Sequence, residues 1–135
     1  VRMQVLAGNV SPVLYDLTIC GEKPWVGVDI HPNRTPNPII LSRNYTVYVA
    51  CLGNAKTDVT LLTWQTARFG PTGTEASAVR APTFRDINND GFMDALYGFR
   101  TFECGFAMGQ TTGTFSIDSP GGCDMSATDS VVVSP

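Results

Sequence analysis

Glycine and proline interrupt this chain so often that almost no window of it can hold an amphipathic helix. The 135 residues include 13 Gly and 9 Pro, with many Thr and Asn between them. An apolar period of 3.6 residues therefore does not develop. Short alternating runs recur instead, as in residues 26–30 (VGVDI). Because such alternation places one face of a strand in a core, we predict a chain built from strands.

The predicted strands are short and are separated by turn-forming residues. Three prolines between residues 31 and 38 exclude a central strand there. The run 45–52 (YTVYVACL) is rich enough in β-branched and aromatic residues to be buried on both faces. Many short strands joined by turns predict an all-β fold, an antiparallel β-sandwich. Further strands are expected at residues 1–5, 15–19, 94–102, 113–117 and 130–133, and either a strand or a short helical turn at 59–64.

We expect two parts in the chain, a sandwich domain at residues 25–135 and an N-terminal strand extension and linker at residues 1–24. The break at residues 20–24 (CGEKP) has linker chemistry. Within the extension, residues 1–6 alternate and are followed by a second break at residues 8–12 (GNVSP). This strand either pairs within its own subunit or joins the open sheet edge of a neighbour. Strand exchange of the second kind would build a homo-oligomer or a filament.

Residues 86–94 (DINNDGFMD) carry the one motif with a definite chemistry. Oxygen-bearing side chains stand at positions 1, 3, 5 and 9, and Gly91 stands at position 6. Calcium takes six to eight oxygen ligands, and a tight loop with a glycine at its sharp turn presents alternate side chains to one ion. We therefore predict a Ca²⁺ site. The expected ligands are Asp86, Asn88, Asp90, the backbone carbonyl of Phe92, and Asp94.

This loop differs from a helix-loop-helix calcium site, because the twelfth position is Tyr97 rather than the usual bidentate Glu. It leads into an apolar alternating run, so we expect it to feed a strand and to bind weakly, with a Kd on the order of 10⁻⁴ to 10⁻³ M. The alternative is an Asp- and Asn-rich turn whose side chains only cap backbone N–H groups. Calcium is favoured because three crowded carboxylates repel one another without a cation.

An ordered set of motifs along the chain resembles a widespread bacterial secreted module. The motifs are VDIHP at residues 28–32 with Pro36 and Asn37, VYVACL at 47–52, RFGPTGTEA at 68–76, the calcium loop and strand at 86–99, and TDSV at 128–131. The resemblance implies an extracellular β-sandwich with a calcium loop and no known catalytic centre. The chain departs from the module's pattern at His31, where a Lys is usual, at Asn88, where an Asp is usual, and in the segment before residue 26.

The four cysteines stand far apart and form no C-x-x-C pair, which excludes a zinc ribbon. We expect disulfides in an oxidising compartment, each stabilising the fold by about 3 to 4 kcal/mol. All three pairings stay open, and buried free thiols are the alternative. The cysteines are Cys20, Cys51, Cys104 and Cys123.

Composition narrows the classes of function. The net charge is −3 without a run of Lys or Arg, so nucleic acid is an unexpected partner. We expect no membrane span, since no stretch approaches 18 apolar residues. His31 is the single histidine, which excludes most His-based triads and metal sites. We therefore expect a non-catalytic protein that is secreted or displayed on the cell surface.

The leading hypothesis is a structural or adhesive extracellular module, stabilised by calcium and able to assemble through its N-terminal strand. The alternative is a carbohydrate-binding accessory domain in which aromatic side chains stack on a polysaccharide. Such aromatics are more often core residues. Asn33 and Asn44 also fit the short N-glycosylation pattern, whose specificity is low. The candidate stacking residues are Trp25, Tyr45, Tyr48, Trp64 and Tyr97.

Overall fold

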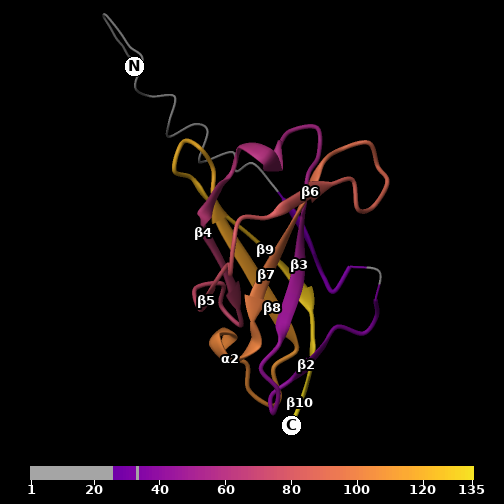
Figure 1. Ribbon diagram of the computed structural model, residues 1–135, viewed down its shortest axis with the longest axis vertical. Helices are drawn as coiled ribbons and strands as arrows, with labels where there is room; N and C mark the ends of the chain where they lie inside the picture. The colour runs from indigo at the N-terminus through magenta and orange to yellow at the C-terminus, as the bar shows by residue number, and fades with distance from the viewer. Residues whose placement is uncertain (1–25, 33) are drawn as a thin grey trace, which may run out of the picture.

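The computed structural model describes residues 26–32 and 34–135, which form two four-stranded antiparallel sheets packed face to face (Figure 1). The first sheet has the order β1 (Gly27–Ile30), β3 (Thr46–Leu52), β7 (Asp94–Arg100), β6 (Thr83–Arg85). The second has the order β5 (Ala76–Ser77), β4 (Thr63–Gly70), β8 (Thr112–Asp118), β9 (Asp124–Ser130). The all-β sandwich prediction is confirmed.

Smaller elements complete the fold. Strands β2 (Pro38–Ile40) and β10 (Val132–Ser134) form a separate parallel pair. Between residues 26 and 135, position 33 aside, the helical elements are single turns, η1 (Val59–Leu61) and α2 (Thr101–Cys104). Some predictions lie outside the described residues. They are the strands at residues 1–5 and 15–19, the N-terminal extension at residues 1–24, the disulfide at Cys20, the stacking residue Trp25 and the glycosylation pattern at Asn33.

Aromatic side chains fill the space between the two sheets. Tyr97 and Phe99 alternate along β7 and point inward, toward Phe69 of β4 and Phe115 of β8. The ring centroids lie 5.3 Å apart for Tyr97 and Phe115 and 5.4 Å apart for Phe69 and Phe99. Tilted aromatic pairs at this spacing contribute about 0.5 to 1.5 kcal/mol each beyond the burial of their surface. Strand β7 therefore carries the centre of the core.

A carboxylate links the two sheets where β1 and β9 are their edge strands. Oδ2 of Asp129 accepts hydrogen bonds from the backbone N–H of Ile30 (3.0 Å) and from Nδ2 of Asn37 (3.1 Å). The same Asn37 amide group donates to the carbonyl of Ser130 (2.9 Å). Side-chain hydrogen bonds thus connect β1 and β9, which belong to different sheets and form no backbone ladder with each other. They also hold the segment before β2 against β9.

Several strand boundaries differ from the expectations. The strand expected at 94–102 ends at Arg100 because the chain turns into α2, which Gly105 closes with a φ of 78°. The 59–64 segment begins as a helical turn and becomes strand only at Thr63. Strand β9 was missed, and the strand expected at 130–133 is instead the end of β9 followed by β10. Residues 45–52 are not buried on both faces, since Tyr48 is 49% exposed.

The expectation that all four cysteines form disulfides is wrong for Cys51 and Cys104, which are free and buried. Cys51 stands opposite Ala95 near one end of β7, and Cys104 follows the other end of that strand. Five residues of strand span about 17 Å, whereas a disulfide requires α-carbons within about 7 Å. Burial raises the pKa of each of these thiols to about 12. Cys123 is disulfide-bonded.

The Asp29 carboxyl on β1 gives the fold a pH dependence. Its pKa is raised, first by burial and then by the negative charge of Asp129. A raised pKa means that the folded state holds the proton more tightly, so this stability is present below the unfolded pKa and lost as the pH rises through the folded pKa. We expect Asp29→Asn to raise the free energy of unfolding at pH 7 and to leave it unchanged near pH 3. Urea denaturation at the two pH values measures this, and a loss of stability at pH 7 would contradict it.

Candidate metal site

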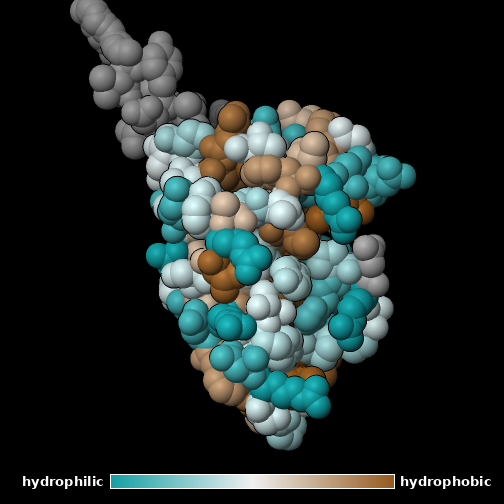
Figure 2. Space-filling view, viewed as in Figure 1, coloured by the Kyte–Doolittle hydropathy of each residue, from teal (hydrophilic) through white to brown (hydrophobic). Residues whose placement is uncertain are grey.

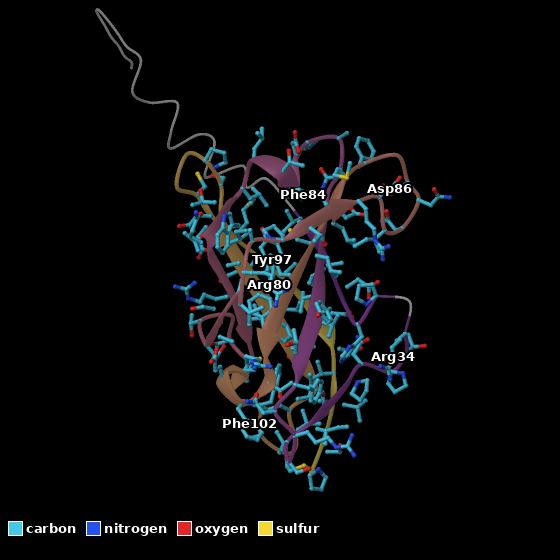
Figure 3. All side chains as sticks on the ribbon, viewed as in Figure 1. Arg34, Arg80, Phe84, Asp86, Tyr97 and Phe102 are labelled. Atoms are coloured by element: carbon cyan, nitrogen blue, oxygen red, sulfur yellow. The ribbon has the colours of Figure 1, made fainter. Side chains whose placement is uncertain are left out.

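The loop between β6 and β7 brings three carboxylates together at one end of the sandwich (Figure 3). Arg85 is paired with Asp94 across the two strands, so residues 86–93 form the connection of a hairpin. The first and last acids of the motif are therefore close in space. One carboxylate oxygen from each of Asp86, Asp90 and Asp94 lies within 4.8 Å of the others.

The backbone of this loop needs two left-handed residues. Asn89 has a φ of 60° and Gly91 a φ of 89°. A Cβ on Gly91 would meet nothing within 4 Å, so glycine is needed there for its conformation and not for space. The turn aims N–H groups at the acids: Asp86 accepts hydrogen bonds from the N–H groups of Asp90 (3.1 Å) and Gly91 (2.8 Å). Asp90 accepts one from the N–H of Phe92 (2.9 Å).

Asp94 fastens the loop to the sandwich. Its side chain is fully buried. Oδ1 accepts a hydrogen bond from the N–H of Gly53, just after β3, at 2.9 Å, and Oδ2 accepts one from the N–H of Ile87 at 2.8 Å. A Cβ on Gly53 would collide with the backbone oxygen of Met93, so only glycine allows the loop this close to β3. One carboxylate thus joins the loop, β7 and the end of β3.

Among the described residues, no hydrogen-bonded cation balances the charge of the three acids. In the described part of the chain, the hydrogen bonds that they accept come from backbone N–H groups. Two unit charges within 4.8 Å of each other repel by at least about 3.5 kcal/mol at an effective dielectric constant of 20. Oxygens within 4.8 Å of one another are also close enough to bind one ion whose ligands lie at about 2.3 to 2.6 Å. The capping expected as the alternative is present, but it leaves this clustering of charge unexplained.

The structure brings together three of the five sequence-predicted ligands. Asp94 is buried, Asp86 is half-buried and Asp90 is exposed. Asn88 and Phe92 are on the exposed side of the same loop, and ligation by their side-chain and carbonyl oxygens stays a prediction. Sequence reasoning missed Gly53, because the partner of Asp94 is 41 residues away along the chain. The Gly-Asn pair at residues 53 and 54 signals only the end of a strand.

The aromatic residues proposed for sugar stacking are not gathered on one surface of the described chain. Tyr97 is 1% exposed, and Tyr45 and Trp64 pack against the core. Tyr48 is exposed but lies on β3 of the first sheet, whereas Trp64 lies on β4 of the second. Two sheets of a sandwich direct their outer faces away from each other. The candidates within the described residues therefore share no stacking platform.

His31 lies in the turn after β1, where its ring contacts a backbone carbonyl. Its Nε2 is 3.0 Å from the carbonyl oxygen of Pro38, which requires the proton on that nitrogen. Burial lowers the pKa of the ring, so the neutral form is favoured. The residue also has a φ of 49°, which fixes it in the turn after β1.

Comparison with known proteins leaves the family open. No protein-family model matches the chain, and no curated protein matches it. The resemblance to the secreted bacterial module therefore stays a prediction. Within residues 26–32 and 34–135, none of the helices has the length and apolar character needed to cross a bilayer.

The hydrogen bonds of Asp94 predict a large structural role that does not depend on any ion. In the presence of a chelator, Asp94→Ala should lower the free energy of unfolding by about 3 kcal/mol, because it leaves buried N–H groups without partners. Urea denaturation measures the effect. Asp124→Ala, which removes an exposed acid from the start of β9, is the control and should cost less than about 0.5 kcal/mol. A similar small loss for Asp94→Ala would contradict the assignment.

Proposed function

We propose that the chain is a calcium-stabilised, non-catalytic structural module of an extracellular or cell-surface protein. The observation that carries the proposal is the group of carboxylate oxygens from Asp86, Asp90 and Asp94, within 4.8 Å of one another and hydrogen-bonded only by the backbone in the described chain. Calcium is a hard cation that prefers such oxygens. The side chain of Asn88 and the carbonyl of Phe92 would complete the ligand set.

A cation in this loop would stabilise more than the loop itself. Strand β7 lies between β3 and β6 in the first sheet, and it begins at the ligand Asp94. Asp94 is also bonded to Gly53 at the end of β3. An ion that fixes Asp86 and Asp90 around Asp94 therefore holds β6, β7 and β3 in register. Weak binding suffices, because extracellular calcium sites commonly have a Kd on the order of 10⁻⁴ to 10⁻³ M.

Two free thiols and the histidine of the described chain favour a non-catalytic role. The thiols of Cys51 and Cys104 are buried with a pKa of about 12 each, so both are protonated at neutral pH. His31 is engaged with the Pro38 carbonyl. The carbohydrate-binding alternative has less support, because the described candidate aromatics share no exposed surface.

The proposal includes self-assembly through residues 1–6. Val1, Met3 and Val5 alternate with Arg2 and Gln4, a pattern that needs a second strand to bury its apolar face. An isolated short strand is not stable in water. Donation of this strand to a neighbouring copy would link subunits head to tail into a filament.

Calcium dependence of stability tests the metal proposal. At about 10 mM calcium, the free energy of unfolding of the unaltered protein should be about 1.4 to 2.7 kcal/mol higher than with a chelator. This range holds for a Kd about ten- to a hundredfold below the calcium concentration. Asp90→Ala should abolish this difference, because it removes one carboxylate. Asp124→Ala should retain it. Thermal unfolding with calcium and with chelator measures the effect, and equal melting of the unaltered protein in both would contradict calcium binding.

The assembly proposal predicts that one face of the N-terminal segment is essential. The full chain should form species larger than a monomer in size-exclusion chromatography with light scattering. Val5→Asp places a charge on the apolar face and should give monomers that keep the calcium effect. Gln4→Asp places the same charge on the opposite face and should still assemble. A monomeric full chain at high concentration would refute self-assembly.

A further inference from the structure

An apolar groove lies at the end of the sandwich away from the metal loop. Its volume is about 330 Å³, and it lies between β2 and α2. Ile39, Ile40 and Leu41 line one side, and Thr101, Phe102 and Phe106 line the other. Figure 3 shows Phe102 and Asp86 at opposite ends of the molecule.

The groove has a buried apolar floor and an exposed aromatic rim. Ile39 is 1% and Phe106 8% exposed, whereas Phe102 is 61% exposed. Helix α2 is only four residues long and ends at Gly105, so Phe102 stays on the outside of the turn. Figure 2 shows one tan, moderately hydrophobic area over α2, beside teal and white residues. An exposed large aromatic beside an apolar groove is typical of an interaction surface.

The chain joins the sandwich at the opposite end from this groove. Gly27, the first residue of β1, pairs with Leu52 at the end of β3, next to the Gly53 contact of the metal loop. The groove lies instead at the other end of the sheet, where α2 follows Arg100, the last residue of β7. Seven residues of strand separate the two ends by about 23 Å. A segment that precedes β1 therefore starts at one end of its own subunit, while the groove opens at the other.

We infer that this groove is the acceptor for residues 1–6 of a second copy, an inference that rests on the proposed self-assembly. The apolar side chains of Val1, Met3 and Val5 would enter the groove and be covered by Phe102. Glu103, exposed beside Phe102, offers a negative charge to Arg2, the only charged side chain of the segment. The 20 residues from 7 to 26 span up to about 66 Å when extended, which is enough to reach an adjacent subunit. Repetition of this contact produces an open head-to-tail chain.

Complementation between two defective copies tests the inference with the full chain. Val5→Asp removes the donor, and Phe102→Asp removes the acceptor. Each variant alone should be monomeric, with a self-association Kd raised at least about 30-fold, as for loss of an apolar anchor. Mixed in equal amounts, they should form a one-to-one heterodimer that does not extend, because one intact donor and one intact acceptor remain. Tyr48→Asp is the control, because Tyr48 is 49% exposed on β3 and its replacement also leaves the core intact. This variant should assemble like the unaltered chain.

Analytical ultracentrifugation separates the outcomes. If Phe102→Asp assembles normally while Val5→Asp does not, the groove is not the acceptor, although the proposed assembly through residues 1–6 stands. If both variants are monomeric and their mixture forms no heterodimer, the inference is also overturned. A charge exchange gives a second readout that leaves Phe102 in place. Glu103→Lys should weaken assembly, and Arg2→Glu in the same chain should restore it; failure of the restoration would exclude the Arg2–Glu103 contact.

Discussion

The buried carboxylate of Asp94 joins segments that are distant in sequence, and the rest of the structure is arranged around it. It binds the N–H of Gly53 after β3 and the N–H of Ile87 in the loop. It is also the first residue of β7, the strand that carries Tyr97 and Phe99 into the core. A buried charge of this kind is stable only when its oxygens are satisfied. The local chemistry of the loop and the packing of the sandwich are therefore coupled through one side chain.

This coupling explains why a weak metal site would matter for the fold. The backbone already holds Asp94, and its N–H groups bend the loop so that Asp86 and Asp90 face the same point. The remaining obstacle is the repulsion among three negative charges, which a divalent ion removes. Ion binding at the loop would then also stabilise the pairing of β3, β6 and β7.

The sequence predicts the parts of this fold whose signal is local. Alternation identifies β1, and β-branched and aromatic content identifies β3. The spacing of residues 86–94 identifies a loop whose acids do converge. Strand β9 was missed because its sequence, DMSATDS, buries only Met125 and relies on pairing with β8. The free thiols Cys51 and Cys104 were mispredicted because their separation depends on register, which sequence does not reveal. The contact between Asp94 and Gly53 was invisible for the same reason.

The most direct test of the metal site is an anomalous-difference map from crystals of the full chain grown with calcium. The carboxylate geometry predicts a peak about 2.3 to 2.6 Å from oxygens of Asp86, Asp90 and Asp94. A map at saturating calcium that has no peak among these carboxylates, with only water between them, would contradict the central claim.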